Sequence, residues 1–527
     1  MRIATKTIKD FPWGTIDTLE DRSLPDGAAS RSINWITSVD KIELRRGYGV
    51  LGNEISGTGK ITGLYVATKR DGTEIAYRTR GKKLEYLATD TWTEVDADVL
   101  GAAAEGKDIS FAEYHPTAGD YLYINSPYGP FLKIDLDTPG SATDVYDVAK
   151  NHKGYIRIKQ NRMFLWGRTA DTTSLYLSKI DNLEDFTWST PRVASEGDVV
   201  PQGDGGNLMD VLSFGADEYC IHESKIWVLT LGIDDTTYTN YIYRERTGMP
   251  TFRSGISTKN GIYFIDDADK KDPQGRVVTI DLETAEKLVL SVSQGIRYKK
   301  KMVGLNLADY SFDKAITFEW GNYILFAFRQ TTSSENDRVL LYDKNKKTLD
   351  MQDYWVSCMA IYGGTLIAGD PSTDNVYTLF SLWDDDDALI INYWEGNKDN
   401  LGWEGLQTVK KLIIEGDIGV DQELKISASI DNGTFVEIGT IKGSGSYVDR
   451  GQSVSVGSLI IGSREVGGGS EGASAYHYKT ELSFGQDKFD DVKLRFECLG
   501  LGYCSISSYA FDDIRIKSKK IASKYRS

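Results

Sequence analysis

The sequence contains few cysteines. Its 527 residues include four, Cys220, Cys358, Cys498 and Cys504, which are too few for a disulfide framework. Cys498 and Cys504 lie close together in the sequence and could face each other across a tight hairpin, but small buried thiols are the simpler interpretation. We therefore expect free thiols and synthesis in a reducing cytoplasm.

Long apolar stretches are missing as well. The first residues, MRIATKTIKDFPWG, lack the apolar core and the small-residue cleavage site of a secretory signal. No run of roughly 18 apolar residues occurs, as a membrane-spanning helix would require. We expect neither secretion through such a signal nor insertion into a membrane.

Positive charge is in the minority. Lysine and arginine number 61 against 77 aspartates and glutamates, which gives a net charge of −16. A general nucleic-acid binder would carry a basic footprint, so this class is disfavoured. An acidic wall past which DNA slides without sticking remains compatible with this charge.

Signatures of catalysis and of metal binding are also missing. The four histidines, at positions 115, 152, 222 and 477, lie far apart, and neither HExxH nor GxSxG occurs. The sequence Gly57–Lys60 is too short for a phosphate-binding loop and reads as a turn before a strand. We expect no catalytic residue, no cofactor-binding residue and no metal ligand, and hence a protein that is not an enzyme.

The sequence contains two acidic clusters and one Asp-Asn-Gly sequence that bear on metal binding and on sugar chemistry. The run Asp384–Asp387 and the group Asp266, Asp267, Asp269 and Asp272 could hold Ca²⁺. Successive residues of an extended chain point opposite ways, so solvated turns are favoured. SIDNGTF, residues 429–435, is close to the Asp-box of sialidase propellers but occurs once, so we interpret it as a hairpin turn.

Aromatic residues are abundant, with 30 Tyr, 18 Phe and 11 Trp, and many of them fall in a repeated pattern of short strands. Each unit contains two apolar segments separated by a polar or glycine-containing turn. The seven pairs are EIAYRT with KLEYLA (from 74 and 83), YLYINS with PFLKID (121, 130), RMFLWG with SLYLSK (162, 174), KIWVLT with YIYRER (225, 241), GIYFID with RVVTID (261, 276), YILFAF with RVLLYD (323, 338) and TLIAGD with NVYTLF (365, 375).

Three or four strands per unit, repeated every 40–60 residues or so, predict an all-β chain with a β-propeller of about seven blades. Six or eight blades, or two β-sandwiches in series, are the alternatives. We expect an N-terminal arm over residues 1–55, with KIELRRG (41–47) as the candidate strand that closes the last blade. The propeller is expected over 56–400 and a C-terminal, jelly-roll-like β-sandwich over 405–527, including a flexible loop at 467–474.

Three stretches resemble the virion-associated β-propeller proteins of tailed bacteriophages, which include the tail nozzle or stabilisation proteins and related minor tail proteins. The matching positions are Pro25, Gly27, Asn34 and Arg45–Arg46–Gly47 in the first stretch, Ser178, Asp181, Asp185 and Phe186 in the second, and Trp394 with Lys410–Lys411 in the third. The ending IRIKSKKIASKYRS is similar to the basic arm that closes such chains.

The resemblance implies a structural protein of the virion, made in the host cytoplasm. It implies a homo-oligomeric ring, usually a hexamer, beneath the portal and adaptor and in contact with tail fibres or the tip. Double-stranded DNA would leave through this ring without specific binding. The basic end, which carries Lys517, Lys519, Lys520, Lys524 and Arg526, is suited to docking on neighbouring subunits.

A glycan-binding or glycan-degrading propeller protein, either an adhesin or a polysaccharide hydrolase or lyase, is the alternative function. A hydrolase would need two convergent carboxylates at the propeller axis. An adhesin would need exposed aromatic side chains, for which Trp394, Trp403, Tyr476 and Tyr478 are the candidates.

Overall fold

The computed structural model describes most of the chain, and strands dominate it. The described residues are 3–17, 19–38, 40–53, 60–146, 152–187, 189, 196–201, 203–231, 238–266, 276–281, 289–291, 296–298, 301–303, 309–402, 406–443, 447–449, 462–463 and 475–516. Within these ranges the only helical elements are two short 3-10 turns, Asp21–Ser23 and Ala102–Ala104. The prediction of an all-β chain is confirmed.

Over the described residues the middle of the chain forms seven four-stranded antiparallel sheets. The first contains β6 (Ile61–Thr68), β7 (Glu74–Arg80), β8 (Lys83–Ala88) and β9 (Thr91–Glu94), and the second β10 (Ser110–Tyr114), β11 (Tyr121–Asn125), β12 (Leu132–Asp135) and β13 (Ala142–Asp144). The third contains β14 (Tyr155–Lys159), β15 (Arg162–Trp166), β16 (Ser174–Leu177) and β17 (Asp198–Pro201).

The fourth sheet contains β18 (Leu208–Phe214), β19 (Asp217–His222), β20 (Lys225–Leu231) and β21 (Tyr238–Glu245), and the fifth β22 (Gly255–Thr258), β23 (Gly261–Asp266), β24 (Arg276–Asp281) and β25 (Val289–Ser291). A hairpin of β26 (Ile296–Tyr298) and β27 (Lys301–Val303) follows. The sixth contains β28 (Tyr310–Trp320), β29 (Tyr323–Gln330), β30 (Arg338–Asp343) and β31 (Leu349–Gln352). The seventh contains β32 (Cys358–Tyr362), β33 (Thr365–Gly369), β34 (Val376–Leu379) and β5 (Tyr48–Val50).

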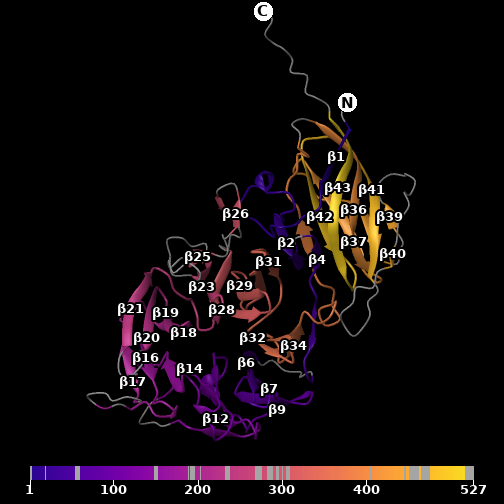
Figure 1. Ribbon diagram of the computed structural model, residues 1–527. Coiled ribbons are helices and arrows are strands. Elements are labelled where there is room, and N and C mark those ends of the chain that lie inside the picture. Colours follow the sequence, from indigo (N-terminus) through magenta and orange to yellow (C-terminus); the bar gives the residue numbers. More distant parts are fainter. Residues whose placement is uncertain are drawn as a thin grey trace, which may run out of the picture.

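Apolar clusters between neighbouring sheets arrange these sheets in a closed ring (Figure 1). Leu122 of the second sheet packs with Tyr77 of the first, for example, and Ile262 of the fifth packs with Ile221 of the fourth. Ile367 of the seventh sheet shares a cluster with Leu64 of the first, so the last sheet packs against the first. A four-stranded meander cannot cover both of its faces alone, and closure removes the exposed edges.

Each strand pair predicted from the sequence is paired in the structure. The alternation of Tyr, Ile, Val and Phe with small or polar residues explains why these segments were recognisable. In the fourth sheet the predicted pair corresponds to β20 and β21, because the preceding strand DEYCIH, with its acidic start, was not recognised.

The rest of the described chain forms two larger sheets that face each other (Figure 1). One contains β1 (Ile3–Ile8), β3 (Trp35–Thr37), β4 (Ile42–Leu44), β36 (Gln407–Gly419), β40 (Gly462–Ser463), β41 (Ala475–Phe489) and β43 (Cys504–Ile516). The other contains β2 (Arg31–Ile33), β35 (Tyr393–Glu395), β37 (Glu423–Ile430), β38 (Val436–Lys442), β39 (Tyr447–Asp449) and β42 (Val492–Cys498). We call this part the two-sheet unit.

The N-terminal segment contributes to both parts of the molecule. Strands β1 to β4 join the two-sheet unit, and Trp35, Ile42 and Leu44 are buried in its core beside Trp394 and Phe496. The chain then crosses to the ring, where β5 pairs with β34 and completes the seventh sheet.

The strand expected to close the ring was misplaced by a few residues. The sequence KIELRRG contains β4, which pairs with β43 in the two-sheet unit, because Ile42 and Leu44 alternate into the core of that unit. The alternation breaks at Arg45–Gly47, and the closing strand β5 begins after this break.

If the N-terminal segment is part of the core, Trp35→Ala should remove a large buried side chain. Trp35 is 0% exposed, so we expect a loss of about 3–5 kcal/mol in the free energy of unfolding. Trp355→Ala is the matched control, since Trp355 is 47% exposed and should cost under about 1 kcal/mol. Urea denaturation followed by circular dichroism compares the two, and equal losses would contradict the placement of Trp35.

Candidate functional site

A cavity of about 710 Å³ lies where the first strands of the ring sheets meet. All of these strands contribute to its wall, through residues that include Tyr65, Phe111, Arg157, Ser213, Ile256, Thr317 and Met359. We call it the axial cavity. Both apolar and charged side chains line it, so it could hold a small ligand with both polar and apolar surfaces.

Two cations of the axial cavity are paired with buried carboxylates behind the wall. Arg157 Nη2 lies 3.2 Å from Asp210 Oδ2, and Lys159 forms an ion pair with Glu218. Burial raises the pKa of Asp210 and that of Glu218, while the adjacent cations oppose both shifts. The carboxylates neutralise the two cations and hold them in fixed positions.

Arg253 reaches across the ring at one end of this cavity. It precedes β22 of the fifth sheet, yet its guanidinium donates to the carbonyl oxygen of Thr62 in the first sheet at 3.3 Å and forms an ion pair with Asp108, before the second sheet. A second cavity of about 280 Å³ shares Phe252, Arg253 and Ile316 with the first. Arg253 therefore lies in the wall between two neighbouring cavities.

The chemistry available at the axial cavity is limited by this pairing. Among the described residues of its wall, Glu113 is the carboxylate, and its Oε2 lies 3.1 Å from His115 Nε2. A glycosidase of the usual kind places two carboxylates on either side of the scissile bond. The wall supplies one carboxylate and three cations, Arg157, Lys159 and Arg253, which suits binding better than hydrolysis.

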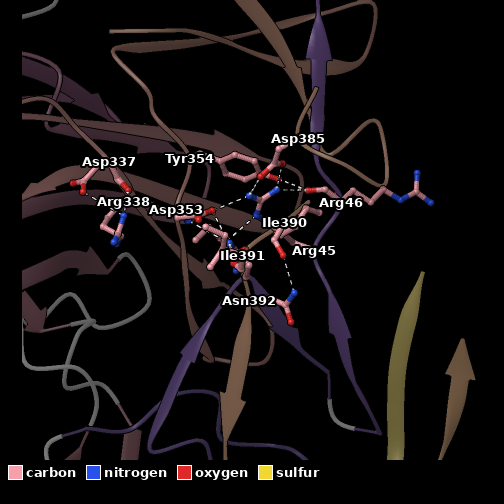
Figure 2. A network of polar contacts seen from close by, with 12 residues as sticks. Arg45, Arg46, Asp337, Arg338, Asp353, Tyr354, Asp385, Ile390, Ile391 and Asn392 are labelled. Atoms are coloured by element: carbon pink, nitrogen blue, oxygen red, sulfur yellow. Dashed lines mark hydrogen bonds and ion pairs between the residues drawn. The ribbon is translucent and has the colours of Figure 1, made fainter. Parts of the chain in front are cut away.

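A second polar site lies where the ring meets the two-sheet unit, between β4 and β5 (Figure 2). The side chain of Arg45 is 0% exposed. Both of its terminal nitrogens donate to Asp385, at 2.7 Å each, and Nη2 also donates to Asp353 Oδ1 at 2.8 Å. Its Nε donates to Asn34 Oδ1 at 2.8 Å, and Asn34 Nδ2 donates to the carbonyl oxygen of Ile391 at 2.6 Å. We call these residues the Arg45 network.

The Arg45 network stabilises a positive charge that is buried from solvent. The guanidinium carbon lies 4.0 Å from the centre of the Tyr354 ring, a favourable position for a cation. Burial alone would lower the pKa of Arg45, but Tyr354, Asp385 and Asp353 raise it overall, so the guanidinium stays charged. A bidentate arginine–carboxylate pair has fixed geometry, so the network sets how the three chain segments lie relative to one another.

The acidic run Asp384–Asp387 only partly follows the prediction of a solvated turn. Asp386 and Asp387 are exposed, but Asp385 is the bidentate partner of Arg45. The run also approaches the backbone after Arg45 closely, since a Cβ at Gly47 would lie 1.5 Å from the carbonyl oxygen of Asp384. Glycine is required there because no side chain fits.

A buried carboxylate forms another contact between the ring and the N-terminal segment. Asp350 of β31 accepts from Thr37 N at 3.0 Å and from Thr37 Oγ1 at 2.8 Å. Burial raises the pKa of Asp350 to about 6, against the opposing effect of these two hydrogen bonds.

The remaining residues singled out in the sequence are dispersed. Asp431 and Asn432 have positive φ in the turn between β37 and β38, so the hairpin interpretation of SIDNGTF is confirmed. Trp394 and Tyr478 are buried, which excludes them as sugar platforms. The described cysteines are buried and free. The predictions that fall outside the described residues concern Gly57–Thr58–Gly59, Asp267, Asp269, Asp272, Trp403, Gly467–Ser474, Lys517, Lys519, Lys520, Lys524 and Arg526. The structure does not describe the side chain of Tyr476.

The described histidines stay apart, as their spacing suggested. His115 lies 2.9 Å from Asp120, His477 lies 3.0 Å from Asp417, His222 bonds the carbonyl oxygen of Gly206, and His152 packs against Phe186. In the part of the chain that the structure covers, no group of His, Cys, Asp and Glu is arranged to hold a metal ion. No helix in that part is long and apolar enough to cross a membrane.

The roles of Arg253, Arg45 and Asn34 are not predictable from the sequence. Arg45 and Asn34 belong to the first stretch of the phage-protein resemblance, but their partners Asp353 and Asp385 lie more than three hundred residues away. Asn34 and Arg253 also have φ values of 61° and 72°, which nothing in the surrounding sequence indicates.

The comparisons with known proteins do not assign this chain to a family. No protein-family model and no curated protein matches the chain. The extracellular domain of a hybrid two component system from B. thetaiotaomicron aligns at 6% identity and a TM-score of 0.38, over 62% of this chain and 42% of that one, so this chain spans less than half of that neighbour. An exo-β-1,3-galactanase from Phanerochaete chrysosporium aligns at 10% identity and a TM-score of 0.24, over 89% and 99%. TM-scores this low do not establish a shared fold.

Removing the buried cation of the Arg45 network should lower the free energy of unfolding. Arg45→Met leaves Asp385 and Asp353 without their partner, and we expect the free energy of unfolding to fall by about 3–5 kcal/mol. Arg46→Met, at the exposed neighbouring position, should cost under about 1 kcal/mol. In a double-mutant cycle measured by urea denaturation, Arg45→Met with Asp385→Asn should cost less than the sum of the two single changes. Additive losses would contradict the pairing.

Asp350 should make stability depend on pH. Its pKa is about 6 in the folded protein and 3.8 in the reference state, so the folded protein binds the extra proton between these values. The contribution is fully present below about pH 4 and lost as the pH rises through 6, by up to about 3 kcal/mol. Asp350→Asn should therefore flatten the fall in stability between pH 4 and 7, measured by urea denaturation, and a variant with the unchanged pH profile would contradict this.

Proposed function

We propose that this chain is a structural subunit of a bacteriophage tail, resembling a tail nozzle protein. In this proposal the ring of sheets is a seven-bladed β-propeller and the two-sheet unit is a β-sandwich. Copies of the chain form a homo-oligomeric ring, most simply a hexamer, around the channel through which DNA leaves. The ring lies in the virion and connects portal-side adaptor proteins to the fibres or tip.

The observation that carries this proposal is the rigid connection between the two parts of the chain. One N-terminal segment adds strands to both, and the buried Arg45 network joins Asn34, Asp353 and Asp385 at the crossing point. A connector in a tail must transmit force without changing shape, and a buried, bidentate charge pair between packed sheets suits this task. The net charge of −16 suits a wall beside DNA, which like charges would repel.

The axial cavity also supports a role other than catalysis. Asp210, Glu218 and Asp108 each form an ion pair with a cation, and Arg253 divides the space along the axis. A cavity of about 710 Å³ is too small to admit a DNA duplex, so in this proposal DNA would pass outside the individual propeller.

A glycan-binding or glycan-degrading protein is the second candidate function. It is favoured by the 710 Å³ axial cavity, whose wall carries the carboxylate Glu113. Burial raises the pKa values of Asp210 and Glu218, but these two carboxyls lie behind the wall in ion pairs with Arg157 and Lys159 and do not reach a bound sugar.

One set of measurements on the purified full-length chain distinguishes the two candidate functions. Light scattering and negative-stain electron microscopy should find closed rings, with a mass that is a whole multiple of the monomer mass. Incubation with capsular and cell-wall polysaccharides should release no sugar. A chain that stays monomeric at all concentrations and is absent from phage particles contradicts the tail proposal. Sugar release that is lost in Glu113→Gln, with an unchanged circular dichroism spectrum, would establish the alternative.

A further inference from the structure

Some of the most exposed apolar side chains of the described residues gather at the ring-side end of the two-sheet unit. Leu389 and Ile391 are 54% and 76% exposed, and Leu499 and Leu501 are 44% and 41% exposed. Leu389 and Ile391 lie just before β35, and Leu499 and Leu501 lie in the turn between β42 and β43. Isolated exposed apolar residues are ordinary, but a group of four on one surface needs a partner.

A side-chain bridge holds the two segments close together. In the β35–β42 pair Trp394 is opposite Phe496 and Glu395 is opposite Arg495. Beyond these pairs, Asn392 Nδ2 donates to the carbonyl oxygen of Cys498 at 2.9 Å and its Oδ1 accepts from Cys498 N at 2.8 Å. Ile391 and Leu499 are the residues next to this bridge, and Leu389 and Leu501 follow two residues further along each segment.

We call Leu389, Ile391, Leu499 and Leu501 the joint patch. One part of its edge is acidic, since Asp386 and Asp387 are exposed immediately before Leu389 and Asp385 is held by Arg45, while Arg46 lies over Trp383 on another part. A partner that fits such a surface carries apolar side chains among positive charges, so that both parts of the surface are satisfied.

The end of the chain has this composition. Residues 517–527, KSKKIASKYRS, contain four lysines and one arginine, no carboxylate side chain, and the apolar residues Ile521 and Tyr525. We infer that the joint patch binds residues 517–527 of a second copy of this chain. The inference deepens the proposed function, on which it rests for the presence of neighbouring copies in a ring.

The length of residues 517–527 shows whether they can bind the joint patch of their own copy or only that of a second copy. Strand β43 begins beside the joint patch, where Tyr503 packs on Trp383, and its far end pairs Arg515 with Ile3 of β1. At about 3.4 Å per residue, β43 carries the chain roughly 40 Å away from the patch. Eleven residues span at most about 40 Å when fully extended. The same chain could reach the patch only as a straight strand with no length left to bind, whereas a neighbouring copy has no such limit.

Cross-linking between labelled chains tests this directly. Tyr525 is replaced by the photoreactive residue p-benzoyl-phenylalanine in the full-length chain, and unlabelled and isotope-labelled chains are mixed and allowed to assemble. After irradiation, mass spectrometry should find cross-links from position 525 to peptides that contain Leu389–Ile391 or Leu499–Leu501, with the two ends from differently labelled chains. Cross-links within one chain, or to other segments, would overturn the inference.

Substitutions give a second readout that does not need the photoreactive residue. Ile391→Ser combined with Leu499→Ser should weaken self-association at least about tenfold in sedimentation experiments. Val436→Ser is the matched control, because Val436 is 63% exposed on the remote strand β38 and should change association less than about twofold. Raising the salt concentration should also weaken association, because it screens the acidic edge from the basic segment. Equal effects of patch and control variants would overturn the inference.

Deletion of residues 517–527 distinguishes this inference from the proposed function. If the shortened chain still forms rings as readily as the full chain, the inference fails and the tail proposal stands. If the cross-links form between copies but the protein is absent from virions, the tail proposal fails and the docking contact stands. Loss of rings in the shortened chain, with an unchanged circular dichroism spectrum, supports both.

Discussion

The structure depends on how the chain accommodates one buried positive charge. Arg45 lies between β4 and β5, which belong to different parts of the molecule, and its side chain has no access to water. An unpaired guanidinium in that place would cost several kcal/mol, so its partners must be present whenever the fold is complete. Those partners, Asp353 and Asp385, follow the sixth ring sheet and the seventh. Correct placement of one side chain therefore requires the ring, the connecting segment and the two-sheet unit together.

The N-terminal segment imposes a similar constraint through its strands. The seventh sheet needs β5 to complete it, and the two-sheet unit needs β1 and β4 along β43, at the opposite end of the sequence. Such pairings close very long loops, so they form late relative to the local hairpins within each sheet. Closure of the ring and formation of the two-sheet unit are thus coupled through about fifty residues. Within this segment the short sequence LRRGYG contains both the end of β4, at Leu44, and the start of β5, at Tyr48.

The sequence predicted the local parts of this fold and missed the long-range ones for a physical reason. The strand pairs of the ring, such as Tyr323–Gln330 with Arg338–Asp343, are hairpins whose alternation and turns are written in adjacent residues. The Arg45–Asp385 pair spans 340 residues, and no local pattern distinguishes Asp385 from the three aspartates around it. Trp394 and Tyr478 resembled sugar platforms because burial cannot be read from residue type. KIELRRG was assigned to the wrong sheet because alternation shows that a strand exists, not which edge it joins.

The size of the axial cavity explains why the proposed function requires several copies. At about 710 Å³ the axial cavity has the size of a small-ligand pocket and cannot hold a DNA duplex. Arg253, with its bonds to Thr62 and Asp108, further blocks the axis. In the proposed function the DNA channel therefore lies between copies of the chain, with whole subunits as its wall. Contacts between copies then become part of the proposed function, and the exposed apolar group at Leu389, Ile391, Leu499 and Leu501 is a surface suited to such a contact.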